Sequence, residues 1–347
     1  MSTGRISQMK VISGIGQMQP TSISQSAGVY LEVLSGGSTG KPKRLSRSIQ
    51  SWTHSARVEA TVFGLGPTDS FAVLGDPDHS LWAYAQFRAE LIDSAFLGLR
   101  KPDEPNLTQL QSSRSTVLYG VPELVLSVAR RLAKSHKTLP SIRRILLGGG
   151  SLPTRAPLDL IQRIFPKADI WMFYGSAEAS FIGYAALGQP YIAFPDVELD
   201  IRDDKSILVR SPMTVSPGAW VNTGDLGCWV ESGRFEIIGR VSRQLQLKGK
   251  KYLTETMEGR LSKGLDLDHV ALLQDRSGHV CFIYTRSGLA ADFPDLTLFR
   301  ANQLIREYDP DFPLVRRIQT LAVGQWPLTG SGKTNWQALA DHLDVPR

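Results

Sequence analysis

Residues 33–45 read "VLSGGSTGKPKRL" and gather three glycines, three serine or threonine hydroxyls and two lysines into one short stretch. Glycines let a backbone approach phosphate closely, and free N–H groups bind its oxygens. The nucleotide-binding P-loop requires G-x-x-x-x-G-K-[ST]. Here Ser35 stands at the first glycine position, and Pro42 follows Lys41 where a hydroxyl residue should be. The P-loop is therefore excluded, and this concentration of glycines and hydroxyls needs another explanation.

Composition limits the class of protein. The chain has 347 residues, 42% hydrophobic and 21% charged, which is typical of a soluble globular protein with two domains. Its net charge of +6 favours an anionic partner, but the cations are too scattered to indicate nucleic acid. We expect no membrane span and no secretory signal. Together with the isolated Cys228 and Cys281, this predicts a reducing cytoplasm.

Hydrophobic periodicity alternates between strand and helix along the first two thirds of the chain. We expect strands at 29–34, 116–119, 144–147 and 170–174, and helices at 48–63, 122–134 and 155–165. This order predicts an α/β fold with a layered, mostly parallel sheet. Short strands dominate after Ile201, and helices are expected near 298–307 and 336–343. The sequence thus predicts a flexible arm at 1–25, a large domain at 26–240 and a small, mobile α+β domain at 241–347.

Further polar motifs follow the glycine-rich stretch in order. They are "LLGGGSLP" (146–153), "MFYGSAEAS" (172–180), "VNTGDLG" (221–227), "IIGR" (237–240) and "PLTGSGKTNW" (327–336). Each alone has a structural explanation, because glycines and aspartates are common where strands end. The last also fails as a P-loop, since Pro327 occupies its first glycine position.

Taken together, the motifs resemble those of the adenylate-forming superfamily: acyl-CoA synthetases, peptide-synthetase adenylation domains and luciferases. "SGGSTGKPK" is similar to T-S-G-S-T-G-x-P-K, "YGSAE" to Y-G-x-T-E, and "TGD" is the same tripeptide. "GRVSRQLQLKG" is similar to G-R-x-D-D-x-I-K-x-x-G, and "PLTGSGK" to P-x-T-x-x-G-K. The resemblance covers residues from about 29 to 340 and favours the acyl-CoA ligases.

The resemblance implies a role for each matching residue. The phosphate loop lies between two strands and surrounds the ATP phosphates with Ser35, Gly36, Gly37, Ser38, Thr39, Gly40 and Lys43. The adenine side comprises Gly149, Gly150, Ser151 and Tyr174, with Gly175 and Ser176 also binding the nucleotide. Asp225 and Arg240 hold the ribose, and Glu178 is a Mg²⁺ ligand. Lys333 neutralises the charge that develops as carboxylate and α-phosphate join.

The acid and acceptor sides follow from the same resemblance. His79 is expected to line the acyl side, whereas a peptide-synthetase interpretation would use Asp78 to hold an amino group. Ser242 is the expected hinge. The basic stretch with Lys248, Gly249, Lys250 and Lys251 is expected to bind coenzyme A or the phosphopantetheine of an acyl carrier protein.

Departures from the family pattern keep alternatives open. Ala177 replaces a threonine, Ser242 and Arg243 replace paired aspartates, and Gln246 replaces a lysine. Relatives carry a subdomain before the phosphate loop, so we expect a homo-oligomer or a partner protein to cover that side. The favoured prediction is an acid–thiol ligase that forms an acyl-adenylate and then a thioester. The alternatives are a nucleotide-binding regulatory protein without turnover and an adenylating enzyme with an amine acceptor.

Overall fold

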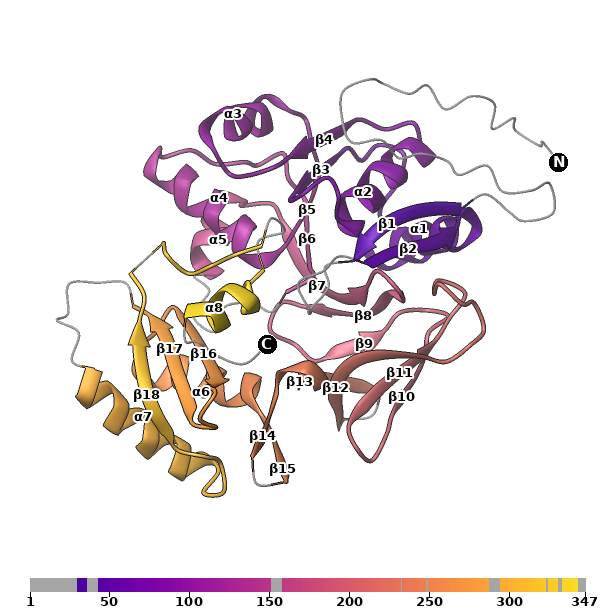
Figure 1. The fold of residues 1–347 in the computed structure, drawn as a ribbon. Helices are drawn as coiled ribbons and strands as arrows, with labels where there is room; N and C mark the ends of the chain where they lie inside the picture. Colours follow the sequence, from indigo (N-terminus) through magenta and orange to yellow (C-terminus); the bar gives the residue numbers. More distant parts are fainter. Residues whose placement is uncertain are drawn as a thin grey trace.

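The computed structural model describes residues 30–35, 43–150, 158–231, 233–247, 249–286, 294–322, 324–329 and 333–342 (Figure 1). The predicted arm at 1–25, the loop residues Gly36, Gly37, Ser38, Thr39 and Gly40, and also Ser151 and Lys248 lie outside the described residues. Ser35 and Lys43 are described in their backbone only.

The elements alternate along the chain much as the periodicity predicts. The helices are α1 (Ile49–Phe63), α2 (Ser80–Leu91), α3 (Glu104–Ser112), α4 (Pro122–Lys134), α5 (Leu158–Ile164), α6 (Thr254–Leu265), α7 (Pro294–Tyr308), α8 (Trp336–His342) and the 3₁₀ turn η1 (Val241–Arg243). The strands are β1 (Tyr30–Ser35), β2 (Lys43–Ser48), β3 (Phe71–Leu74), β4 (Phe96–Leu99), β5 (Val117–Gly120), β6 (Arg144–Gly148), β7 (Asp169–Ser176), β8 (Ser180–Ala186), β9 (Tyr191–Ala193), β10 (Glu198–Ile201), β11 (Ser206–Arg210), β12 (Val221–Glu231), β13 (Arg234–Arg240), β14 (Gln244–Leu247), β15 (Lys250–Leu253), β16 (His269–Gln274), β17 (Val280–Thr285) and β18 (Val315–Thr320).

The large sheet confirms the α/β fold but is mixed rather than mostly parallel. Its order is β10-β11-β12-β13-β9-β8-β7-β6-β5-β3-β4. Only β4, β3, β5, β6 and β7 pair in parallel. Parallel neighbours need a crossover, usually a helix, whereas a short turn joins antiparallel ones. The chain turns back directly after Ser176, so antiparallel pairing begins at β8, earlier than the predicted change near Ile201.

Successive side chains of a strand point to opposite faces of the sheet, so a layer of helices packs against each face of the parallel half. Phe71, Val73 and Tyr119 pack in the core that includes residues of α1 and α2. Ala72 and Leu118 pack in the opposite core with α3, α4 and α5. The apolar residues Trp52 and Phe63 of α1 are buried in the first core, and Ile49 and Ala60 pack against it. Figure 1 shows the two helical groups on either side of β3–β7.

The chain beyond Arg240 forms smaller sheets with their own hydrophobic core. β14 and β15 pair as a hairpin, and β16, β17 and β18 form a separate sheet. β17 and β18 are parallel, because α7 provides the crossover between them. Core residues of α6, α7 and this sheet pack together. The division at residue 240 stays a prediction. No helix in the described part of the chain is both long and apolar enough to cross a membrane.

Candidate active site

The carboxyl ends of the parallel strands open onto a cavity of about 610 Å³. Ligands of open α/β sheets commonly bind at this edge. Eleven of the predicted site residues line the cavity, although they come from distant parts of the chain. They are His79, Gly149, Gly150, Tyr174, Gly175, Ser176, Glu178, Asp225, Arg240, Ser242 and Lys333. Gly249, Lys250 and Lys251 do not line it.

Tyr174, Asp225 and Arg240 form a hydrogen-bonded set on one side of the cavity. The Tyr174 hydroxyl donates to Asp225 Oδ2 at 2.8 Å, and Arg240 Nε lies 2.6 Å from Oδ1. Asp225 and Arg240 face each other because β12 and β13 pair at these positions. Burial raises the pKa of Asp225, while Arg240 acts in the opposite direction. Each carboxylate oxygen keeps a second lone pair, so the set can still accept hydrogen bonds from a diol.

Lys333 reaches the same cavity from a short hairpin. Its backbone carbonyl accepts from the N–H of Thr329 at 2.7 Å, and Asn335 N donates to the carbonyl of Pro327 at 2.8 Å. The Cε of Lys333 lies only 3.3 Å from the place that a Cβ at Gly149 would occupy. Gly149 also has a φ of +76°, so a side chain there would strain the backbone and crowd the lysine.

Opposing charges surround the Lys333 amine. Burial lowers the pKa of this amine, and Arg240 lowers it further, whereas Asp225 and Glu178 raise it. The cavity leaves its side chain exposed to water even though protein walls surround it. Lys333 is thus a fixed cation at the meeting point of three strand ends and the hairpin.

Glu178 lies in the tight turn between β7 and β8. Its backbone carbonyl accepts from Val215 N at 2.8 Å, and Ser176 Oγ accepts from Ala179 N at 3.1 Å. A Cβ on Gly175 would lie 2.1 Å from the carbonyl oxygen of Ser180. Gly175 and Ser176 therefore shape the turn that carries Glu178 to the cavity.

In the turn between β7 and β8, Glu178 provides one carboxylate that could bind a divalent cation. Among the described residues, no group of three or more His, Cys, Asp and Glu side chains could hold a metal. Mg²⁺ is commonly bound through one or two carboxylates and the phosphates of a substrate. Glu178 fits that arrangement. The described residues around it do not form a metal site made of protein ligands alone.

His79 and the neighbouring Asp78 lie directly before α2 (Ser80–Leu91). His79 is the N-cap of this helix and lines the cavity, whereas Asp78 is exposed and does not. Burial, and next Lys333, lower the pKa of His79, which favours the neutral imidazole. Of these two residues, only His79 lines the cavity.

The strands on either side of the predicted phosphate loop, β1 and β2, form a two-stranded sheet outside the large one. Ser35 and Lys43 are paired at the ends of antiparallel β1 and β2, so residues 43–48 form the returning strand that the resemblance implied. The loop itself lies outside the described residues.

Some positive charges of the basic stretch after the 3₁₀ turn are paired with carboxylates, which its sequence does not indicate. Arg243 Nη2 lies 2.6 Å from Glu258 Oε1 and its guanidinium stacks on Trp336 at 3.3 Å. Lys250 Nζ lies 3.3 Å from Asp311. Part of the charge expected to attract an anionic acceptor is therefore paired with carboxylates.

Sequence reasoning assigned no role to several further residues that line the cavity. They are Arg47, Trp52, Tyr84, Phe173 and Phe181. Phe173 lies in the motif "MFYGSAEAS", whereas the others lie outside the quoted motifs, in β2, α1, α2 and β8. Only their burial in the fold brings them together.

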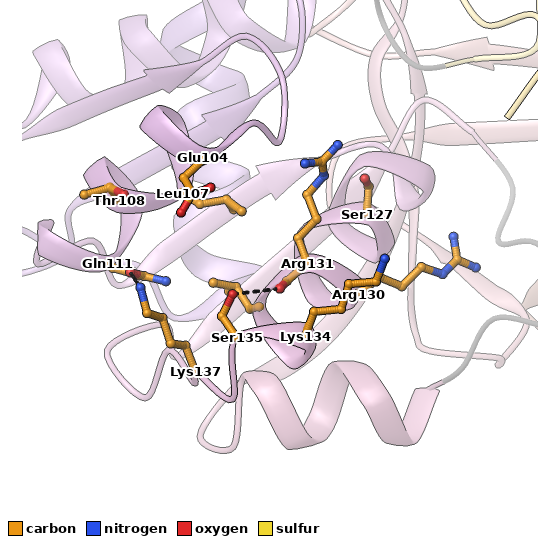
Figure 2. Close-up of a pocket in the computed structure, with 11 residues that line it drawn as sticks. Glu104, Leu107, Thr108, Gln111, Ser127, Arg130, Arg131, Lys134, Ser135 and Lys137 are labelled. Carbon is orange, nitrogen blue, oxygen red and sulfur yellow. Dashed lines mark hydrogen bonds between the residues drawn. The ribbon is translucent and has the colours of Figure 1, made fainter.

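A second cavity, of about 440 Å³, lies between α3 and α4 (Figure 2). Its walls carry the exposed cations Arg130, Arg131, Lys134 and Lys137. Lys137 Nζ donates to Gln111 Oε1 at 3.0 Å. The residues that line it, all within the described ranges, include none of the predicted site residues.

Comparisons with known proteins show similarity to ligases and to an amide bond synthetase. The chain is 25% identical to the 2-succinylbenzoate–CoA ligase of Listeria monocytogenes serovar 1/2a, over 86% of this chain and 66% of that protein. It is 22% identical to the L-proline–[L-prolyl-carrier protein] ligase of Streptomyces coelicolor, over 89% and 65%. The amide bond synthetase McbA from Marinactinospora thermotolerans shares the fold with a TM-score of 0.73 and 21% identity, covering 90% of this chain and 69% of that one.

The matches also have a limited extent. The chain spans about half to two thirds of the length of the curated relatives that it matches. The profile of the family described as "AMP-binding enzyme" matches residues 8–214, which is more than half of the chain. The chain therefore belongs to the AMP-binding enzyme family, as its resemblance to the adenylate-forming superfamily predicted.

Proposed function

We propose that the protein activates a carboxylic acid by adenylation. One observation carries this proposal: Lys333, Glu178 and the Asp225–Arg240 pair line a single cavity at the carboxyl edge of the sheet. A binding protein needs contacts to the base and sugar. The additional cation and carboxylate beside them suit the chemistry of phosphate transfer.

In the proposed reaction, a carboxylate oxygen of the acid attacks the α-phosphorus of ATP, and the bond to the β-phosphate oxygen breaks. The products are an acyl-adenylate and pyrophosphate. Asp225 and Arg240 hold the ribose, and Glu178 would hold Mg²⁺, which neutralises charge on the departing pyrophosphate. Lys333 stabilises the negative charge shared by the carboxylate and α-phosphate oxygens in the transition state.

The second step of the proposal is transfer to a thiol. The sulfur of coenzyme A, or of a carrier-protein phosphopantetheine, attacks the acyl carbonyl carbon and AMP leaves. We assign residues 26–240 to a large domain and 241–347 to a small one that rotates about Ser242. Support comes from the position of Ser242, which follows β13 in η1 and lines the cavity. Lys248, Gly249, Lys250 and Lys251 are the proposed acceptor-binding stretch.

A non-thiol acceptor, such as an amine, is the second candidate. It is favoured by the ion pairs of Arg243 and Lys250, which reduce the free positive charge near the proposed acceptor stretch. Gln246, exposed on β14, adds none. The adenylation half of the proposal is the same in both cases.

The deciding experiment is acid-dependent exchange of labelled pyrophosphate into ATP, measured over a panel of carboxylic acids without acceptor. We expect exchange with at least one class of acid. Coenzyme A, a phosphopantetheinylated carrier protein and simple amines are then added separately, and products are identified by mass spectrometry. Tight ATP binding without exchange for any acid would indicate a regulatory nucleotide-binding protein without turnover. Exchange followed by amide but no thioester would replace the thiol with an amine.

A further inference from the structure

Arg47 is a buried cation that has no carboxylate partner among the described residues. Only 4% of its surface is exposed, yet it lines the main cavity. Its guanidinium donates to two serines: Nε and Nη2 donate to Ser51 Oγ at 3.2 and 2.8 Å, and Nη2 donates to Ser55 Oγ at 3.1 Å. Among the described residues, no carboxylate lies within ion-pair distance of this guanidinium, and Nη1 has no hydrogen-bond acceptor.

The two serines cannot compensate the charge, because they are neutral. Ser51 Oγ donates its proton to the carbonyl of Met213 at 2.9 Å, and Ser55 Oγ donates to the carbonyl of Ser51 at 2.9 Å. Their oxygens therefore face Arg47 as acceptors only. Ser180 Oγ, 2.8 Å from Ser55 Oγ, completes the polar cluster. The cluster fixes the direction of the guanidinium but leaves its charge unbalanced.

Burial lowers the pKa of Arg47 to about 10, so the side chain is still charged at neutral pH. An unpaired charge taken out of water is costly. Other buried arginines of this protein follow the usual rule: Arg88 lies 3.5 Å from Glu59, and Arg243 lies 2.6 Å from Glu258. Arg47 differs from both because it borders a cavity that can admit an anion.

Arg47 and Lys333 line the same cavity but have different neighbours. Its guanidinium lies 5.1 Å from the centre of the Trp52 ring, and Tyr84 is the charged or polar group that most affects its pKa after burial. Lys333, in contrast, interacts with Arg240, Asp225 and Glu178. The cavity is thus lined by two cations with different neighbours, and aromatic side chains are among its other lining residues.

We propose that Arg47 binds a second carboxylate, at the far end of the acid substrate. The acid would then be a dicarboxylate, with one carboxylate activated beside Lys333 and the other held by Arg47 through charge-assisted hydrogen bonds. Aromatic side chains such as Trp52 and Phe181 would cover its apolar middle. This inference rests on the proposed adenylation and names the class of acid.

The test compares dicarboxylic acids with their own monomethyl esters, which keep the length but lose the distal charge. Aliphatic acids from succinate to suberate and aromatic acids such as terephthalate are used in pyrophosphate exchange. We expect the wild-type protein to prefer a diacid over its ester by at least about tenfold in kcat/KM, the size expected for a charged hydrogen bond. Arg47→Gln should raise KM for that diacid by about ten- to a hundredfold and leave KM for the ester and for ATP near the wild-type values.

Two further variants separate binding from folding. Arg47→Lys keeps the charge and should retain part of the preference for the diacid. Arg131→Gln removes an equal charge from the exposed surface of α4 and should change nothing. If Arg47→Gln weakens diacid and ester equally, Arg47 only holds β2 to α1 and the inference is overturned.

Failure of the inference is distinguishable from failure of adenylation. If no acid supports exchange, adenylation fails, and calorimetric titration of the wild type and Arg47→Gln with the same diacids still tests the subsite. If neutral-ended acids support exchange and diacids do not, adenylation holds and the inference is wrong.

Discussion

Lys333 brings a positive charge close to Arg240, and this proximity helps to lower its pKa. A cation held under such repulsion is most useful where new negative charge forms beside it. The carboxylates of Asp225 and Glu178 partly balance it before substrate binds. In the proposed reaction, the α-phosphate and the acid bring negative charge to Lys333, so attraction outweighs the repulsion from Arg240.

Lys333→Ala should therefore reduce acid-dependent pyrophosphate exchange by about 10²- to 10³-fold, the loss typical of one transition-state contact. ATP binding, measured by calorimetry without acid, should change much less, because Asp225 and Arg240 remain. Arg260→Ala, at an exposed position of α6, is the matched charge control. An exchange rate equal to the wild type would remove Lys333 from the proposed chemistry.

At the scale of elements, the turn between β7 and β8 decides where Glu178 points. The register shifts between Tyr174 and Gly175, where the two strands are irregular. The backbone of Ser180 fills the space that a side chain at position 175 would need. A rigid backbone cannot move aside as a flexible side chain could.

Gly175→Ala should lower the free energy of unfolding by about 1–3 kcal/mol, as overpacking does elsewhere. It should also raise the Mg²⁺ concentration needed for half-maximal exchange, because the turn must shift. The control is Gly259→Ala in α6, where an added Cβ meets nothing within 4 Å and alanine favours the helix. Urea unfolding and Mg²⁺ titration check the two effects, and equal stability of the two variants would refute the steric argument.

Two helices and a strand share one buried carboxyl group. Glu59 of α1 accepts hydrogen bonds from Tyr84 of α2 at 2.8 Å and Tyr119 of β5 at 2.6 Å. Burial raises the pKa of Glu59 from 4.5 to about 7. The folded state therefore holds this proton more tightly than the unfolded chain does.

The stability that this proton provides is complete below about pH 4.5 and is lost as the pH rises through about 7. In Glu59→Gln this contribution is absent, and the variant also leaves Arg88 unpaired at every pH. The difference in unfolding free energy between wild type and variant should change by about 1–3 kcal/mol between pH 5 and 8. Urea unfolding across this range checks it, with the exposed Glu90→Gln as control. A difference that stays constant with pH would contradict the raised pKa.

At the scale of the whole molecule, the segment beyond Arg240 contacts the large sheet's helices away from the proposed hinge. His269 Nε2 at the start of β16 lies 3.6 Å from Glu123 Oε1 at the start of α4. Together with Lys333 beside Gly149, this contact defines the arrangement in which the proposed adenylation residues line one cavity. Transfer to a thiol, as proposed, requires a different arrangement.

Cysteines at positions 123 and 269, joined by a short bismaleimide, should hold the assembled arrangement. We expect exchange of pyrophosphate to persist and thioester formation to fall by at least about tenfold, because domain rotation is blocked. Cys228→Ser removes the half-buried native thiol, and burial raises the pKa of Cys281 to about 11, which makes it unreactive. Single-cysteine proteins are the controls. Full thioester formation in the joined protein would show that no rotation is needed.

The motifs predicted much of this molecule because each is local in sequence. Strands, glycine turns and the residues directly after them can be recognised in one stretch, and Tyr174, Glu178, Asp225 and Lys333 all line one cavity. Pairing over long distances could not be predicted in the same way. β9 joins β13 across some forty residues, which connects the strands β10–β13 to the rest of the sheet. Arg47 was also missed, because its meaning depends on a serine cluster and a cavity that only the fold creates.

The cavity draws its two sides from different parts of the chain: the Asp225–Arg240 pair from β12 and β13, and Arg47 with its aromatic neighbours from β2, α1 and α2. A protein engineer could therefore change these two groups of cavity residues separately. The hairpin and first two helices could be redesigned for a new acid while the later strands retain the proposed ribose-binding pair. Libraries aimed at new substrates should therefore vary one contiguous stretch, residues 47–84, and leave the rest of the gene unchanged.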